Sequence, residues 1–171
     1  GSDAGLMIIC GIDPGTRTTG YGVLEIRENP RGSLAYVAHG TIRPRAESLS
    51  KRLREIFVDM TELFRRYHPA EVAVEATFHA LNVQSAFKLG QARGAVILAA
   101  SLLDIPVFEY TPTEVKKAAC GYGRAGKEQV GAVIAAVLRI PKGSAVPQDA
   151  SDALAVGLCH CSSRRMKELA R

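Results

Sequence analysis

The chain has 171 residues and a mass of 18.3 kDa, the size of a single domain. With 47% hydrophobic residues and a mean hydropathy of +0.04 it can build a complete apolar core, which excludes intrinsic disorder, collagen and small disulfide-stapled scaffolds. The apolar segment 6–12 is too short to cross a membrane and lacks the basic region and cleavage site of a secretion signal. We therefore expect a cytoplasmic protein with no membrane partner.

The charge balance is basic, with 22 lysines and arginines against 17 acids, a net charge of +5 and a pI near 9.2. This excess fits nucleic-acid binding without proving it. The irregular spacing of Cys10, Cys120, Cys159 and Cys161 favours reduced thiols over disulfides. Cys159 and Cys161 flank a histidine as zinc ligands can, but such a group alone cannot close a tetrahedral site.

The ends of the chain stand apart from the expected domain. Gly1 and Ser2 are typical of a cloning remnant, so residues 1–5 are expected to be a tag remnant or a flexible N-terminus. We expect one domain over residues 6–162 and a basic C-terminal tail over residues 163–171.

The first part of the chain predicts a three-stranded meander followed by a helix. Residues 7–12 form a continuous apolar run, typical of a strand buried on both faces. Residues 21–26 and 34–42 alternate like half-exposed antiparallel strands joined by a turn over 28–32. Apolar residues then recur at steps of three and four over 48–67, which predicts an amphipathic helix.

The rest of the chain alternates helix and strand. We expect strands at 71–75 and 105–110 with a long helix at 80–103 between them. Three more helices are predicted, at 113–120, 127–138 and 149–161. A meander followed by such alternation predicts an α/β fold with a mixed sheet and helices on both faces. Because helix 80–103 carries few charges, it is either buried on several sides or half of an oligomer interface.

Four carboxylates are candidates for a metal site. Asp13 and Glu75 each end a predicted strand, and Asp149 and Asp152 are three residues apart on one helix face. If the two strands are parallel neighbours, the four side chains converge, and their mutual repulsion is relieved by a cation. Oxygen ligands suit Mg²⁺ or Mn²⁺, and two such ions can activate water against a phosphodiester. The pattern therefore predicts a nuclease.

Each acid also has a simpler interpretation. Asp13 could belong only to a turn, and Asp149 and Asp152 could be an N-cap and a first-turn acid. Glu75 is harder to explain, because a carboxylate at the end of an apolar strand is costly to bury without a neutralising partner. The glycine-rich stretch 15–22 lacks the Lys-Ser/Thr pair of a P-loop, so no nucleotide cofactor is expected.

Five sequence blocks in order resemble the RuvC family of bacterial Holliday-junction resolvases, over about residues 7–160. The blocks are GIDPGTRTTGYG (11–22), VEATF (74–78), AFKLGQARG (86–94), VFEY (107–110) and DASDALA (149–155). The resemblance implies an RNase H-like mixed five-stranded sheet and a crossover junction endodeoxyribonuclease that nicks two strands of like polarity in recombination and repair. It also implies a homodimer, which suits the two-fold symmetry of a four-way junction, and association with RuvAB-type branch-migration machinery.

The same resemblance assigns roles to individual residues. Asp13, Glu75, Asp149 and Asp152 match the family's catalytic metal-binding acids, which implies two Mg²⁺ per subunit with Mn²⁺ as a substitute. The family varies at the penultimate acid, where some members have histidine. The residues expected to meet DNA are Phe78, Lys116, Lys127, Arg124 and Arg17, and those expected at the dimer interface are Phe87, Gly90 and Gly94.

Spacing alone also allows Phe78 to be a core residue and helix 80–103 to be an ordinary core helix. Two other functions remain open at this point. One is a protein that binds four-way junctions without cleaving them, although such a protein has no reason to gather acids beside a polyanion. The other is a related RNase H-like nuclease acting on RNA or replication intermediates.

Overall fold

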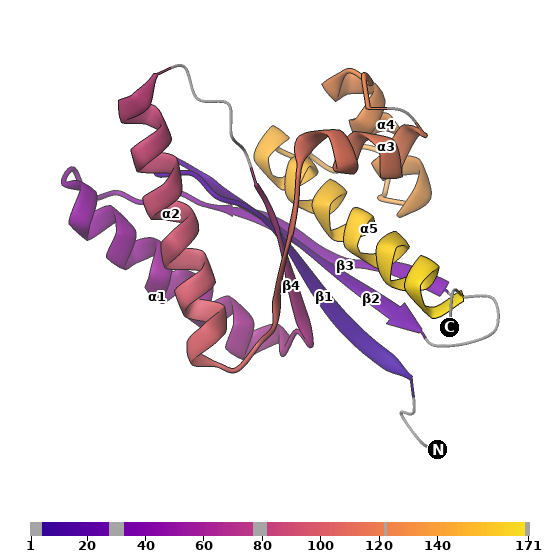
Figure 1. Cartoon of the computed structure of the whole chain (residues 1–171), viewed down its shortest axis with the longest axis horizontal. Coiled ribbons are helices and arrows are strands. Elements are labelled where there is room, and N and C mark those ends of the chain that lie inside the picture. The colour runs from indigo at the N-terminus through magenta and orange to yellow at the C-terminus, as the bar shows by residue number, and fades with distance from the viewer. Residues whose placement is uncertain (1–4, 28–32, 77–81, 122, 170–171) are drawn as a thin grey trace.

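A computed structural model describes residues 5–27, 33–76, 82–121 and 123–169 (Figure 1). Its strands are β1 (Leu6–Asp13), β2 (Thr19–Arg27), β3 (Ser33–Ile42), β4 (Glu71–Glu75) and β5 (Val107–Tyr110). Its helices are α1 (Leu49–Tyr67), α2 (Val83–Leu102), α3 (Pro112–Cys120), α4 (Lys127–Val137) and α5 (Gln148–Leu169). The sheet order is β3-β2-β1-β4-β5, antiparallel from β3 to β1 and parallel from β1 to β5. The mixed five-stranded sheet predicted from the sequence is confirmed.

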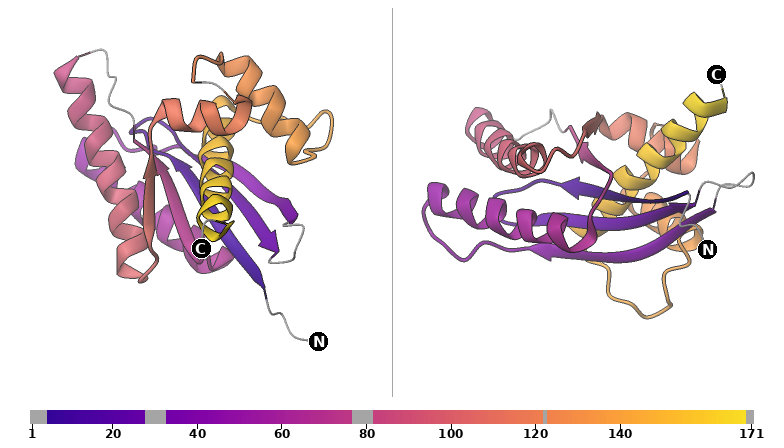
Figure 2. Two further views of the ribbon diagram at one scale, coloured as in Figure 1. Left: turned by 45° about the vertical axis from the view of Figure 1, so that its right-hand side comes forward. Right: turned by 90° about the horizontal axis from the view of Figure 1, so that it is seen from below.

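Helices cover both faces of this sheet (Figures 1 and 2). Helices α1 and α2 pack on one face, over a core that includes Ile12, Val74 and Phe64. Helices α3, α4 and α5 pack on the other, over a core that includes Ile9 and Leu154. Because side chains alternate along a strand, β1 supplies buried residues to both cores, as expected for a central strand.

Three of the differences between the predicted and the observed element boundaries bear on the local structure. Strand β5 begins at Val107 rather than at residue 105, because Asp104 adopts a left-handed φ of 56° and Pro106 has no N–H for a ladder. Helix α3 begins at Pro112, where Thr111 and Glu114 form a capping box. Helix α5 continues to Leu169, through most of the segment expected to be a basic tail.

The structure bears on the expectation of reduced thiols. All four cysteines are free, and burial raises the pKa of the Cys159 thiol to about 11 and that of Cys161 to about 12. His160 between them bonds the Tyr110 hydroxyl through Nδ1 at 2.6 Å, and its Nε2 lies 3.3 Å from the Glu71 carboxylate.

Among the described residues, none of the helices combines the length and apolar character needed to span a bilayer.

Helix α5 lies against the backbone of β1 and β2, and glycines make this approach possible. A Cβ added at Gly11 would lie 2.1 Å from the Ala153 carbonyl oxygen, and one at Gly20 would lie 2.0 Å from the carbonyl oxygen of Asp149. At Gly22 it would lie 2.6 Å from the Leu154 side chain. At Gly11 and Gly20 the clashing atoms belong to the backbone of α5, so a larger residue would force the whole helix to move. These two glycines therefore determine the distance between α5 and the sheet.

Gly11→Ala should therefore destabilise the protein by at least about 2 kcal/mol, the range of overpacking in a tight core. Gly131→Ala is the matched control, because its added Cβ would meet only the Ser151 hydroxyl oxygen at 3.6 Å and it lies inside α4. There the same change should stabilise by about 0.5–1 kcal/mol through helix propensity. Urea unfolding measures both, and equal stabilities of the two variants would contradict the packing argument.

Candidate functional site

Two parallel strands present the first two acids side by side. Asp13 is the last residue of β1 and Glu75 the last of β4, and the pairing of Ile12 with Val74 places the next residues of both strands at one sheet edge. This is the arrangement predicted from the sequence. The turn after Asp13 is closed by Thr19, whose hydroxyl donates to the Gly15 carbonyl at 2.8 Å and accepts from the Gly15 N–H at 3.2 Å.

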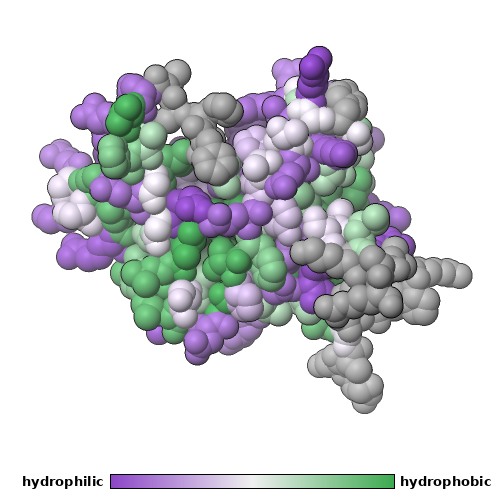
Figure 3. All heavy atoms as spheres, viewed as in Figure 1, coloured by the Kyte–Doolittle hydropathy of each residue, from purple (hydrophilic) through white to green (hydrophobic). Residues whose placement is uncertain are grey.

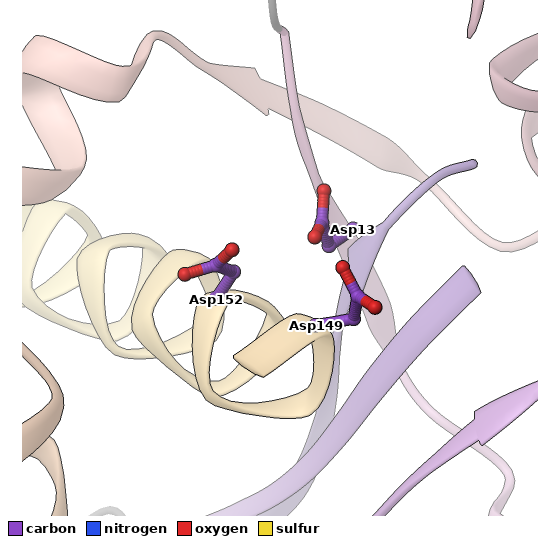
Figure 4. A group of neighbouring side chains, drawn as sticks. All are labelled: Asp13, Asp149 and Asp152. Atoms are coloured by element: carbon purple, nitrogen blue, oxygen red, sulfur yellow. The ribbon is translucent and has the colours of Figure 1, made fainter. Parts of the chain in front are cut away.

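Helix α5 brings the other two acids to Asp13. Carboxylate oxygens of Asp13, Asp149 and Asp152 all lie within 4.8 Å of one another, with Asp13 rising from the sheet and the other two from the start of α5 (Figure 4). Glu75 is not part of this tight group, but its charge is close enough to act on Asp13. Helix α5 begins at Gln148, so Asp149 lies within its first turn and is not its N-cap.

Burial and mutual repulsion disfavour the ionised acids. Burial, followed by the charges of Glu75, Asp152 and Asp149, raises the pKa of Asp13 to about 8. Burial and the charge of Asp152 raise the pKa of Glu75 to about 6, and burial raises the pKa of Asp152 as well. The ionised forms of these half-buried carboxylates are disfavoured, and a bound cation would stabilise them.

Two lysines and a glutamine surround the acids. Gln148 donates from its side-chain nitrogen to Asp152 Oδ1 at 2.8 Å, and Lys127 Nζ lies 4.0 Å from Asp152 Oδ2. Lys116, on α3, acts with Lys127 to lower the pKa of Glu75. Lys127 is the first residue of helix α4, where the helix dipole disfavours a positive charge. The nearby acids of the cluster offset this unfavourable interaction.

The donors at this site are all carboxylate oxygens, which suit a hard divalent ion such as Mg²⁺ or Mn²⁺. Among the described residues this is the only cluster of potential metal ligands, and Cys159, His160 and Cys161 do not form a second one. The acids therefore fit the metal that the sequence analysis expected.

The remaining predicted DNA contacts have different placements. Arg17 lines a cleft beside Asp149, whereas Arg124 is exposed between α3 and α4. Phe78 lies outside the described residues. Sequence reasoning missed Gln148, although its place one turn before Asp152 on a helix is the i, i+4 spacing that allows this hydrogen bond.

Comparisons with known proteins identify the family. The profile of the family "Crossover junction endodeoxyribonuclease RuvC" matches residues 9–160. The chain belongs to the RuvC family. It is 47% identical over 161 residues to the crossover junction endodeoxyribonuclease RuvC of Shewanella sp. (strain W3-18-1), a match that covers 94% of this chain and 90% of the relative.

Solved structures of RuvC have the same fold. Thermus thermophilus RuvC superposes with a TM-score of 0.84 at 33% identity, covering 94% of this chain and 97% of that one. The T. thermophilus RuvC in complex with a Holliday junction substrate gives 0.85 at 32% identity, covering 94% and 96%. The RNase H-like fold implied by the sequence resemblance is thereby confirmed.

The raised pKa of Asp13 predicts a pH-dependent stability without metal. The pKa of the Asp13 carboxyl is about 8 in the folded protein, against an ordinary value of 3.8. Because the unfolded chain loses this proton more readily, the free energy of unfolding falls as the pH rises from about 4 to about 8. Asp13→Asn removes that charge. In EDTA at pH 8 it should raise the free energy of unfolding by at least about 1 kcal/mol, or about 2–4 °C in Tm, and the gain should shrink towards pH 4.

Thermal unfolding at pH 5 and pH 8 tests this prediction, with exposed Asp104→Asn as the control. Added Mg²⁺ should raise the Tm of the unaltered protein at pH 8 and raise that of Asp13→Asn less, since a bound ligand stabilises only the state that binds it. A variant that gains no more stability at pH 8 than at pH 5 would refute the electrostatic account.

Proposed function

We propose that this protein is a Mg²⁺-dependent, structure-selective endonuclease that resolves Holliday junctions by nicking two strands of like polarity. The proposal is carried by one observation, the convergence of Asp13, Asp149 and Asp152 within 4.8 Å in a chain of the RuvC family. It is supported by the T. thermophilus relative, whose structure contains a Holliday junction substrate. A protein that only binds DNA gains nothing from three clustered carboxylates facing a polyanion.

Asp13, Glu75, Asp149 and Asp152 would hold two Mg²⁺ ions, with Asp13 central because the charges of the other three all act on it. When bound, the two ions lower the pKa of a water molecule and shield the departing oxygen. Hydrolysis would form a bond from a water oxygen to phosphorus and break the bond from phosphorus to the 3′ oxygen, and a proton lost by the water would pass through solvent to that oxygen. The products are a 5′-phosphate and a 3′-hydroxyl, which can be ligated.

The lysines would serve the phosphate rather than the metal. Lys127 is exposed yet only 4.0 Å from Asp152, and Lys116 is near enough to Glu75 to lower its pKa. Their ammonium groups can offset the negative charge that develops on the phosphoryl oxygens. Gln148 orients Asp152 by donating to Oδ1, and Oδ2, which lies 4.0 Å from the Lys127 ammonium, is the oxygen that would face a metal ion. Phe78 would stack on a junction base, and Arg124 and Arg17 would contact phosphates.

The outer face of α2 supports a homodimer. Val83, Phe87 and Leu98 are exposed by 72%, 69% and 52%, and Cβ atoms added at Gly90 and Gly94 would meet nothing within 4 Å. These five positions share one helix face, opposite the buried Ala92, Val96 and Ala99. Figure 3 shows hydrophobic surface over this part of the molecule. A C2 pairing of this face would give two nuclease sites for the two strands of a junction.

Phe87→Asp should convert the dimer to a monomer, because a carboxylate placed in an apolar contact loses its hydration without a partner. Val137→Asp, on the exposed side of α4, is the matched control and should leave the mass unchanged. Sedimentation equilibrium or light scattering gives the mass of each. An unaltered protein that is monomeric at micromolar concentration would contradict the interface.

The cellular setting follows from the same proposal. A four-way junction is a recombination intermediate of chromosomal DNA, so the protein would act in the cytoplasm and would receive junctions from a RuvAB-type branch-migration complex. No nucleotide is needed for hydrolysis of a phosphodiester by water.

Cleavage of a labelled synthetic four-way junction tests the function. With Mg²⁺ the protein should cut the junction symmetrically and spare a linear duplex of matched length, and EDTA should abolish cutting. Asp13→Asn and Asp152→Asn should each reduce the rate by at least about 10²-fold, the scale of losing a principal electrostatic group, whereas Asp104→Asn should not. Undiminished cutting by Asp13→Asn would refute the site.

The same assay separates the two other functions. Tight junction binding without cuts in Mg²⁺ or Mn²⁺ would favour a protein that only binds. Faster cutting of an RNA:DNA hybrid of equal length than of the junction would favour a nuclease of RNA or replication intermediates.

A further inference from the structure

A cleft lies next to the acids, on the side facing α1 and α2. It is a cleft of about 760 Å³ bounded by the turn after β1, the start of α1 and the first turns of α2, with Asp149 at its edge. Three cations line it, Arg17, Arg52 and Lys88, against one acid other than Asp149, which is Glu47.

None of these cations has a carboxylate partner within 4.0 Å among the described residues. Arg17 and Lys88 are exposed, whereas Arg52 is half-buried. A half-buried guanidinium is usually paired with an anion, since its desolvation is otherwise not offset. Here its Nε donates to the Ala46 carbonyl at 2.6 Å, and within the described part of the chain no hydrogen-bond partner is given for its two terminal nitrogens.

The direction of Arg52 is set by the helix that carries it. Arg52, Ile56 and Met60 follow one another at four-residue steps, so Arg52 lies on the face of α1 that packs on the sheet, one turn before the buried residues begin. Arg54 and Arg65 lie on the opposite, exposed face. The sequence groups all of these arginines with a charged outer face, and only the three-dimensional placement separates Arg52 from the others.

The wall around Arg52 is held in place. The Glu55 carboxylate accepts from the backbone N–H of Arg45 at 2.7 Å and from that of Ala46 at 3.2 Å. This fixes the segment whose carbonyl receives the Arg52 guanidinium. The first turns of α1 and α2 contain no acidic residue, so the positive ends of both helix dipoles add to the charge of the three cations, and Glu47 and Asp149 are the acids that offset part of it.

We propose that this cleft binds the sugar-phosphate backbone of the DNA strand that runs through the nuclease site, with Arg52 and Lys88 contacting phosphates beside the scissile one. The inference rests on the proposed nuclease function, because it is the position of Asp149 at the cleft edge that links the cleft to the cut. The cleft is open and its three cations outnumber its two acids, Glu47 and Asp149, which suits a continuous polyanion. A strand held there would be oriented before the chemistry begins.

The test uses a charge-matched pair of double variants. Arg52→Gln with Lys88→Glu changes the cleft, and Arg54→Gln with Arg65→Glu makes the same change in net charge on the far face of α1. Binding of the full chain to a fluorescent four-way junction is measured in EDTA over a range of salt concentrations. Thermal unfolding of each variant establishes that it is folded.

We expect the cleft variant to bind the junction at least tenfold more weakly than the unaltered protein. Its slope of log affinity against log salt should be smaller by about 2, since each phosphate contact on duplex DNA contributes about 0.9. The far-face variant should keep the slope of the unaltered protein. Equal slopes for the two variants would overturn the proposal.

Neutral methylphosphonate linkages locate the contact on the DNA. Placed singly along the junction strands, they should weaken binding of the unaltered protein at positions next to its cut site, and the cleft variant should be insensitive at those positions. The same penalty in both proteins would overturn the proposal. Failure of the nuclease function is distinguishable, because the unaltered protein would then not cut the junction in Mg²⁺ or Mn²⁺, whatever the binding slopes are.

Discussion

The close approach of α5 to β1 and β2 is the constraint on which the site depends. Asp149 and Asp152 belong to a helix and Asp13 to a strand, so their carboxylates meet only if the two backbones nearly touch. Gly11 and Gly20 allow this, because any larger residue would place a Cβ about 2 Å from a carbonyl oxygen of α5. The acids thus sit on rigid elements, as a preorganised metal site requires.

The far end of α5 is held by a different interaction. Glu71, at the start of β4, is buried and accepts from Arg164 while facing His160, and His160 also bonds Tyr110. Glu71 and Glu75 lie on the same face of the same short strand as Ala73, which packs in the core under α5, so both carboxylates are on the side of the sheet that α5 covers. The carboxylate of Glu71 is neutralised by Arg164, whereas that of Glu75 lies beside the cluster of Asp13, Asp149 and Asp152, where negative side chains outnumber positive ones. The contrast separates a structural acid from the acid that we propose to be catalytic on physical grounds.

Much of this arrangement was predictable from the sequence because it depends on local patterns. The apolar run before Asp13, the strand before Glu75 and the i, i+3 spacing of Asp149 and Asp152 determine which edge and which helix face carry the acids. Their convergence was predicted from the right-handed crossover through α1, which makes β1 and β4 parallel neighbours. The cleft was not predictable, since the orientation of Arg52 depends on where the buried stripe of α1 begins, and Lys88 joins it only through the packing of α2 beside α1.

The distribution of charge explains how one small domain can attract DNA and still hold a buried acidic cluster. The acids lie at the end of the central strands, partly buried, where burial and, after it, the charges of neighbouring acids raise the pKa values of Asp13 and Glu75. Cations flank them on both sides, with Lys116 and Lys127 on the α3 and α4 side and Arg52 and Lys88 on the α1 and α2 side. A DNA strand that contacts both groups of cations, as we propose, would pass over the acids, where a divalent metal ion would reduce the repulsion between the phosphate and the carboxylates. DNA binding would therefore depend on the flanking cations and cleavage on the acids. The loss of binding and the loss of cleavage can then be measured separately.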